Sequence, residues 1–178
     1  VSGTVNQFGY TNSTVPTKDT EENYYTFTQY LTGLEAWGEI GVTRYGFAQC
    51  TNLAGTIPNP THNSFSEVTD MSMLFYNCKG ISGNIPESLF VTAVRNTSFE
   101  NTFYNCENLT GTIPENLFTR NKNITTFKNT FKGCTGLSGM IPANLFRDNL
   151  ATNYEGTFEN CSGITEAEMT LDTTIVEN

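Results

Sequence analysis

Five cysteines at a nearly constant spacing constrain this chain of 178 residues more than any other feature. They follow one another at intervals of 28, 28, 28 and 27 residues, with a phenylalanine three residues before each and a leucine or isoleucine three residues after. The five are Cys50, Cys78, Cys106, Cys134 and Cys161. A period of about 20 to 50 residues is typical of one structural unit stacked on copies of itself, because a single unit cannot bury its apolar face alone. The sequence therefore predicts a repeat protein with about five coils of 28 residues.

A second motif, Leu-x-Gly-x-Ile-Pro, follows the cysteine within the repeat and predicts a short strand that the proline ends. In the third copy Leu109, Gly111 and Ile113 are expected to point inward. We expect the glycine to leave room for a larger side chain from the opposite wall, with Phe118 as the candidate. The stretch 115–118 predicts one short helical or 3-10 turn, and a second, semi-extended segment should then lead into the next cysteine.

Asparagine and glycine interchange at the position two residues past each cysteine, which predicts a left-handed backbone and a tight turn there. The residues at this position are Asn52, Gly80, Asn108, Gly136 and Gly163.

The two ends depart from the repeat, as the ends of a stacked protein must. We expect residues 1–39 to form an N-terminal cap that is partly helical, with Asp19 and Glu22 as a capping box. Trp37 is expected to be buried where this cap meets the first coil. The repeats should fill residues 40–165, and residues 166–178 should form a C-terminal tail or a partial cap.

The cysteines at one repeat position predict a ladder of parallel thiols. Neighbouring coils would hold them about 4.8 Å apart, whereas a disulfide needs converging vectors and Cβ atoms about 3.5 to 4.5 Å apart. We therefore interpret them as small buried apolar side chains. The chain has no Cys-x-x-Cys pair and His62 is its one histidine, so we expect no metal and no cofactor.

Charge argues against nucleic acid as a partner, because eighteen acidic and nine basic side chains leave a net charge of −9. The sequence contains no uninterrupted apolar stretch of the roughly 18 to 20 residues that a membrane helix needs, so we expect no membrane insertion by this segment. Charges also recur in register and predict ion pairs between coils. The two sets are Glu100, Lys128 and Glu155, and Lys132 with Glu159.

Catalytic motifs are lacking in the sequence, which has no nucleophile elbow, phosphate loop or clustered acidic site. Glu87 and Glu115 are the one repeated carboxylate pair that could resemble the two acids of a glycosidase, and both are expected on an exposed turn. We therefore expect no enzyme, and a polysaccharide-degrading β-helix is the least favoured interpretation.

Two segments, 68–78 and 131–142, resemble the BspA-type leucine-rich repeat surface proteins of bacteria and some protists, whose hallmark is a repeated Phe-x-x-Cys-x-x-Leu. The resemblance covers residues 40–165. It implies an α/β, leucine-rich-repeat-like solenoid of short parallel strands and short helical or 3-10 turns, right-handed as parallel crossovers usually are. It also implies a module, secreted or at the cell surface, that adheres to a host or neighbouring-cell surface protein or glycan. We expect the chain to be monomeric. The repeat of 28 residues is longer than is usual in that family, so the resemblance does not define the curvature.

The candidate binding residues are the outward positions of the expected strands, where partners commonly dock on leucine-rich solenoids. They are Thr56, Ser82, Asn84, Thr110, Thr112, Ser138 and Met140. Small hydroxyl residues also simply solvate a sheet, so a purely structural role is the alternative. Tyr76 and Tyr104 are a further candidate pair for gripping a sugar ring or peptide, with ladder stacking as the alternative.

Two functions stay open on the sequence: a binding module, or a structural spacer within a larger surface protein that has no ligand of its own. An exposed aromatic or apolar patch would favour the first, and an evenly polar surface the second.

Overall fold

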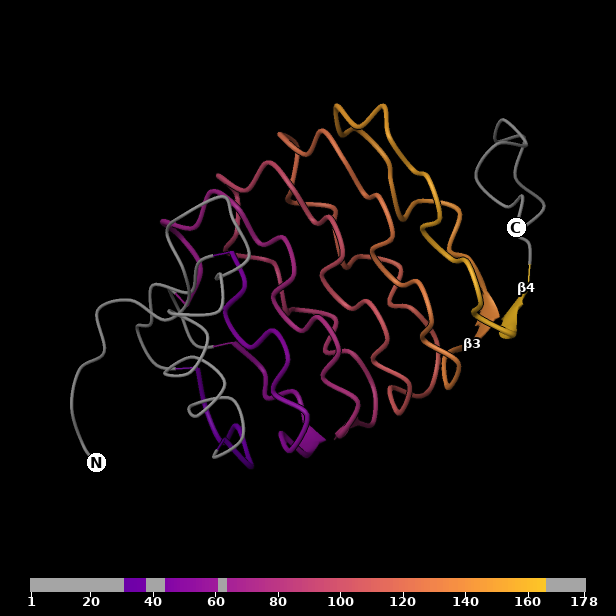
Figure 1. The fold of residues 1–178 in the computed structure, drawn as a ribbon. Helices are drawn as coiled ribbons and strands as arrows, with labels where there is room; N and C mark the ends of the chain where they lie inside the picture. Colours follow the sequence, from indigo (N-terminus) through magenta and orange to yellow (C-terminus); the bar gives the residue numbers. More distant parts are fainter. Residues whose placement is uncertain (1–30, 38–43, 61–63, 166–178) are drawn as a thin grey trace, which may run out of the picture.

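The computed structural model describes residues 31–37, 44–60 and 64–165. Within them the chain winds into coils that stack side by side in sequence order (Figure 1). We define coil 1 as residues 44–69, coil 2 as 70–97, coil 3 as 98–125, coil 4 as 126–152 and coil 5 as 153–165. Equivalent backbone groups join successive coils: the Phe75 N–H donates to the Thr102 carbonyl at 2.8 Å, and the Phe103 N–H to the Thr130 carbonyl at 2.8 Å. The leucine-rich-repeat class and the right hand of the winding stay predictions.

One side of every coil pairs in parallel with its neighbours through very short strands or, in coil 3, through isolated bridges in place of the expected strand. We call this side the strand wall; it comprises residues 53–57, 81–85, 109–113, 137–141 and 163–165. Its strands are β1 (Gly55–Thr56), β2 (Ile81–Ser82), β3 (Ser138–Met140) and β4 (Gly163–Thr165). β1 pairs in parallel with β2, and β3 with β4. Parallel bridges from Gly83 to Leu109 and from Gly111 to Leu137 connect the coils between them.

The glycine of the strand wall interrupts the extended backbone. Gly111 has φ +75° and Gly83 has φ +74°, a region that L side chains rarely adopt. A Cβ on Gly111 would meet the side chain of Asn84 in the preceding coil, and a Cβ on Gly83 would lie 2.9 Å from the Cγ2 of Thr56. The expectation that this glycine makes room for Phe118 is therefore wrong. The position needs glycine because of its backbone angle and the side chain that covers it.

The segment before each cysteine is a run of tight turns, which we call the turn wall; it comprises residues 45–50, 71–78, 99–106, 127–134 and 154–161. In coil 3 the N–H groups of Thr102, Tyr104 and Cys106 donate to the carbonyl three residues earlier. The alternate N–H groups, such as that of Asn101, donate to the next coil. The expectation of a semi-extended segment is therefore wrong, because half of its donors close turns within the coil.

The left-handed residues of the turn wall lie one and five residues before the cysteine, as at Asn105 and Asn101. The position two residues past the cysteine has no positive φ at Gly80, Gly136 or Gly163, so the expected left-handed backbone there is wrong. The expected tight turn is confirmed, because the next N–H donates to the cysteine carbonyl, as from Leu109 to Cys106 at 3.2 Å. A Cβ on Gly80 would lie 2.5 Å from the Leu53 carbonyl oxygen. Glycine is used here because two backbones approach each other closely.

The described residues contain no helix. After the proline, the Leu117 N–H donates to the Pro114 carbonyl at 3.2 Å and the Thr119 N–H to the Asn116 carbonyl at 3.3 Å. These bonds join residues three apart, so the expected short turn is present with hydrogen bonds of the 3-10 type.

The expected capping box of Asp19 and Glu22, and most of the expected cap, lie outside the described residues. Trp37 is fully buried, and its Nε1 donates to the Pro58 carbonyl at 2.6 Å. Its expected burial at the junction with the first coil is therefore confirmed.

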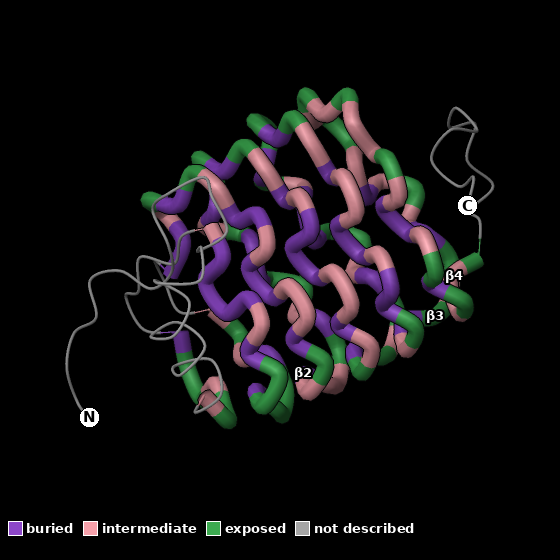
Figure 2. Tube along the Cα trace, viewed as in Figure 1, coloured by how far each residue is buried: buried purple, intermediate pink, exposed green. Residues whose placement is uncertain are grey.

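The core lies between the two walls, and buried segments recur at the same place in successive coils (Figure 2). The phenylalanines of the turn wall stack with ring centroids 5.4 to 5.6 Å apart, from Phe47 through Phe75, Phe103 and Phe131 to Phe158. A second ladder joins Phe90, Phe118 and Phe146. Stacked pairs contribute about 0.5 to 1.5 kcal/mol each beyond the area they bury.

All five cysteines are free and buried. The Cys106 thiol donates to the Phe75 carbonyl at 3.1 Å, and the Cys134 thiol to the Phe103 carbonyl at 3.0 Å. Burial raises the pKa of the Cys50 thiol to about 12 and that of the Cys161 thiol to about 11. The thiols therefore act as buried neutral groups that join the coils.

Candidate binding face on the strand wall

The predicted outward residues of the strand wall lie in one row across coils 1 to 4, and we call this row the strand-face strip. It consists of Thr56, Ser82, Asn84, Thr110, Thr112, Ser138 and Met140. The register that brings them together pairs Thr56 with Ser82 and Met140 with Thr165. All are exposed except Ser82, which is half-buried. None is charged, although the chain has a net charge of −9.

Several strip residues contact the neighbouring coil. Thr56, Asn84 and Thr112 each cover the glycine of the following coil, as the Cβ contacts at Gly83, Gly111 and Gly139 indicate. The Ser82 hydroxyl donates to the Gly55 carbonyl at 3.4 Å, and the Ser138 hydroxyl to the Gly111 carbonyl at 3.5 Å.

Thr110 differs from these strip residues because it covers no glycine and its hydroxyl makes no hydrogen bond to another described residue. It is the position at which the surface can be changed with least effect on the contacts between coils.

Met140 is the one large apolar side chain of the strip, with 59% of its surface exposed. The other large exposed apolar side chains of the described residues lie outside the strand wall: Val91, Val94 and Leu150. The strip is therefore polar, with a single apolar end in coil 4.

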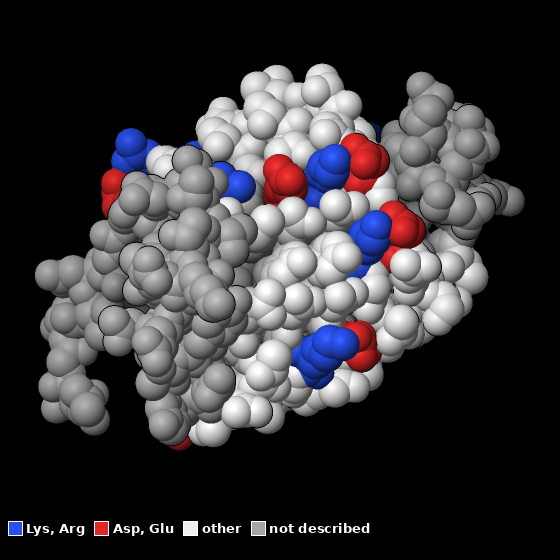
Figure 3. Space-filling model, in the orientation of Figure 1, with Lys and Arg blue, Asp and Glu red and all other residues white. Residues whose placement is uncertain are grey.

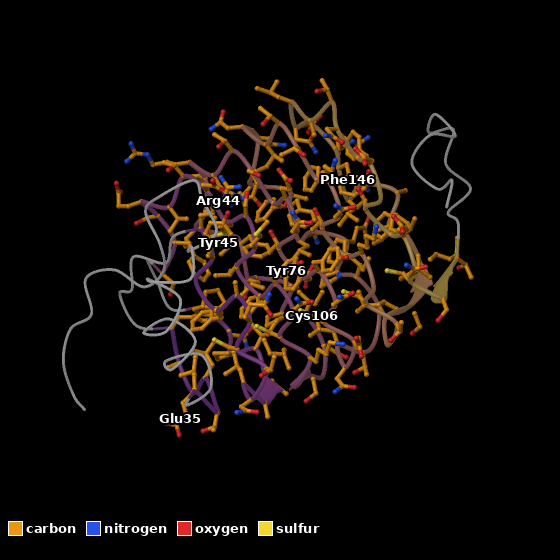
Figure 4. The ribbon with its side chains drawn as sticks, viewed as in Figure 1. Glu35, Arg44, Tyr45, Tyr76, Cys106 and Phe146 are labelled. Atoms are coloured by element: carbon orange, nitrogen blue, oxygen red, sulfur yellow. The ribbon has the colours of Figure 1, made fainter. Side chains whose placement is uncertain are left out.

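Tyr76 and Tyr104 lie on the turn wall, so the structure does not bring them together with the strip. Their rings stack with centroids 4.8 Å apart and an interplanar angle of 22°, and both residues are half-buried. Tyr76 is labelled in Figure 4, together with Cys106 of the same wall. The two rings cover each other's facing surfaces, which agrees with the alternative that this pair stacks between coils as a ladder.

Charged side chains form pairs between neighbouring coils, and several such pairs are visible in Figure 3. The predicted pairs of Lys128 with Glu155 at 2.7 Å and of Lys132 with Glu159 at 2.6 Å are confirmed. Hydrogen bonds to these carboxylates raise the pKa of both lysines. Within the described part of the chain, Glu100 makes no ion pair.

Sequence reasoning did not predict the other ion pairs, which also join residues one coil apart. They are Arg44 with Asp70, Lys79 with Glu107, Arg95 with Glu67 and Lys122 with Asp148.

The repeated carboxylates of Glu87 and Glu115 accept hydrogen bonds from the next coil. Asn116 Nδ2 donates to Glu87 Oε1 at 2.8 Å, and Asn144 Nδ2 donates to Glu115 Oε1 at 2.9 Å. Glu87 and Glu115 are both exposed. Among the residues that the structure describes, no group of three or more His, Cys, Asp or Glu side chains is placed to hold a metal ion. No helix of the described chain is long and apolar enough to cross a membrane.

A ladder of buried hydroxyls was missed by the sequence reasoning. The Thr130 hydroxyl lies 3.0 Å from the Phe99 carbonyl of the preceding coil and 2.6 Å from the Phe127 carbonyl of its own coil. Thr102 and Thr157 repeat this arrangement. The signal was present in the sequence, because a threonine precedes the phenylalanine of the repeat in each of coils 3 to 5.

Comparison of this chain with models of known protein families, with curated proteins and with solved structures finds no match.

Proposed function

We propose that this chain is a non-catalytic repeat module, secreted or held at a cell surface, whose strand-face strip binds a protein or glycan partner. The observation that carries the proposal is an uncharged row of hydroxyl and amide side chains that continues across four coils of an acidic chain. Neutral polar groups are less costly to desolvate than charged groups, and hydroxyls and amides can both donate and accept hydrogen bonds. Such a row suits an extended ligand with polar groups, such as a sugar chain or a peptide.

The repeat fixes the spacing of this row. Parallel pairing and bridges hold successive coils in one register, with Thr56 paired with Ser82 and Ser138 paired with Gly163. The strip is therefore pre-organised, and binding would require little ordering of its backbone.

A structural spacer is the second candidate, and one observation favours it. Thr56, Asn84 and Thr112 cover the glycines of the following coils, so the packing between coils is enough to account for these side chains. Met140 is also the one large exposed apolar side chain on the strip.

A binding screen separates the two candidates. The purified chain is tested against extracellular matrix proteins and a glycan array, at low and at high salt. The strip variant is Thr110→Lys, and the matched control is Val94→Lys, at an exposed position outside the strand wall. Saturable binding that survives high salt, disappears with Thr110→Lys and persists with Val94→Lys supports the binding module.

Two outcomes would contradict the binding proposal. Binding that both variants retain would place the ligand elsewhere on the molecule. No binding across the panel by the folded chain would favour the spacer.

A further inference from the structure

The corner that follows the second phenylalanine ladder gathers basic side chains in an acidic chain. It comprises residues 91–95, 119–123 and 147–150 of coils 2, 3 and 4, and we call it the basic corner. It carries four of the chain's nine Lys and Arg side chains and a single acidic side chain, that of Asp148. The four basic residues are Arg95, Arg120, Lys122 and Arg147. The corner is therefore positive, although the chain has a net charge of −9.

Contacts between coils hold the three parts of this corner side by side. The Asn121 side chain is fully buried, and its Nδ2 donates to the Ala93 carbonyl of coil 2 at 2.8 Å. The Leu150 N–H of coil 4 donates to the Ile124 carbonyl of coil 3 at 3.1 Å. The backbone of the corner is therefore fixed before any partner binds, which lowers the entropy cost of binding there.

Two of the four basic side chains have no acidic partner. The other two are already paired: Arg95 with Glu67 at 2.6 Å, and Lys122 with Asp148 at 3.1 Å. Arg120 and Arg147 are exposed, and neither makes an ion pair with a described residue. They belong to neighbouring coils, which lie about 4.8 Å apart. The two guanidinium groups can therefore reach the same ligand.

Exposed apolar side chains flank these two arginines. Val91 and Val94 of coil 2 expose 42% and 46% of their surface, and Leu150 of coil 4 exposes 65%. Among the described residues, the one other large apolar side chain that is exposed is Met140, on the strand-face strip. The basic corner therefore offers two cationic groups with aliphatic surface in the coils on either side.

The chemistry of the partner follows from these groups. A guanidinium donates two parallel hydrogen bonds to a carboxylate, and the aliphatic side chains need apolar groups to cover them. A neutral sugar chain supplies neither. A membrane surface or a long polyanion would also lie within a Debye length, about 8 to 10 Å, of the acidic remainder of the chain. A short acidic peptide with apolar side chains meets both requirements and contacts the corner alone.

We propose that the basic corner binds an acidic peptide segment of a partner protein that also carries leucine or valine. Its carboxylates pair with Arg120 and Arg147, and its aliphatic side chains cover Val91, Val94 and Leu150. The inference does not depend on the strand-face strip, because the basic corner lies outside the strand wall.

The test uses the full chain and a fluorescein-labelled dodecapeptide in which Glu-Glu-Leu is repeated four times. Both faces of this peptide carry glutamate and leucine when it is extended. One control peptide has glutamine in place of every glutamate, and the other has serine in place of every leucine. Binding is followed by fluorescence anisotropy. We expect saturable binding of the probe that weakens with salt, and at least tenfold weaker binding of each control.

Matched double variants locate the contact. Arg120→Gln combined with Arg147→Gln should weaken binding of the probe at least tenfold. Lys79→Gln combined with Lys128→Gln makes the same change in net charge outside the basic corner, and it should weaken binding less than twofold. Thr110→Lys on the strand-face strip should retain binding, which separates this site from the strip. Circular dichroism checks that each variant is folded.

Three results would overturn the proposal. Equal losses in the two double variants would mean that the probe responds to net charge alone. Absence of saturable binding by the folded chain, or equal binding of the serine control, would remove the acidic and apolar peptide as the partner. Binding to vesicles of phosphatidylserine and phosphatidylcholine, without binding of the probe, would assign the corner to a membrane surface instead.

Discussion

The strand wall and the turn wall share one repeat but satisfy their backbones in different ways. In the turn wall of coil 3 the N–H groups alternate, with one donating within the coil and the next donating to the following coil. In the strand wall the coils are joined by strands of two or three residues and by single bridges. The difference teaches that regular spacing in a sequence does not require regular secondary structure, because tight turns can also pair with equivalents in neighbouring coils.

The two walls also use their side chains differently. The turn wall supplies the central stack of phenylalanine rings and the buried thiols, whereas the strand wall presents small polar residues to solvent. Most of the packing free energy is therefore expected from the inward side chains, and the outer row of the strand wall is free to vary wherever it does not cover a glycine.

The largest expected effect comes from placing a charge at a core-facing position of either wall. Phe103→Asp and Leu109→Asp should each abolish folding, because both positions are fully buried and an unpaired buried carboxylate is very costly. Phe103→Ala should cost about 3 to 5 kcal/mol, which can be measured by urea unfolding followed by circular dichroism. Folded Phe103→Asp protein would contradict the assignment of the turn wall to the core.

A smaller effect is expected at the glycine of the strand wall. Gly111→Ala should cost about 1 to 3 kcal/mol, because the position has φ +75° and a Cβ would meet Asn84. Gly33→Ala is the matched control, since nothing lies within 4 Å of a Cβ placed there. Adding Asn84→Ala should recover the part of the stability lost to the steric clash, while the part lost to backbone strain should remain. If the double variant were no more stable than Gly111→Ala alone, Asn84 would not be what covers the glycine.

The buried thiols of the turn wall predict a loss of stability in alkali. Burial raises the pKa of Cys106 well above its ordinary value of 9.0. Above the ordinary thiol pKa, the thiol loses its proton in the unfolded chain but keeps it in the folded chain. The free energy of unfolding therefore falls by up to about 1.4 kcal/mol per pH unit for each thiol. Cys106→Ala should show a shallower fall than the parent chain in urea unfolding above the ordinary thiol pKa. The raised pKa values of Lys128, Lys132 and Tyr154 also lower the free energy of unfolding in alkali. Both chains carry these three groups, so their contributions cancel when the two chains are compared.

The smallest effect is expected on the outer row of the strand wall. Thr110→Asp should change the free energy of unfolding by less than about 0.5 kcal/mol, because the side chain is exposed and covers no glycine. Thr112→Asp should cost more, since Thr112 covers Gly139. Equal losses at the two positions in thermal unfolding would remove the distinction between free and covering residues of the strip.

Much of the architecture could be predicted because the repeat aligns residues of like chemistry. The ion pairs of Lys128 and Lys132 and the outward position of the strip residues follow from that alignment. The structure of the turn wall could not be predicted in this way. Its pattern of apolar residues fits an extended segment as well as a series of turns, and the positive φ angles fall on residues of several types, such as Tyr45, Met73 and Asn101, that the sequence does not mark as special.

The candidate site was predictable in place but not in detail. The sequence located Thr56, Asn84 and Thr112 on an outer row, but it did not reveal that each covers a glycine one coil away. That contact depends on the parallel register. Thr56 pairs with Ser82, which lies 26 residues later, two residues fewer than the period of 28.

The amino-acid sequence by itself determined the stacking of coils, the identity of the core ladders and the lack of charge on the strip, because each depends on which residues recur at the repeat period. Only the tertiary structure decided how each backbone donor is satisfied, and which glycines are needed for φ and which for close approach. The physical reason is that these properties depend on contacts between coils, and their geometry is set when neighbouring coils pack and pair.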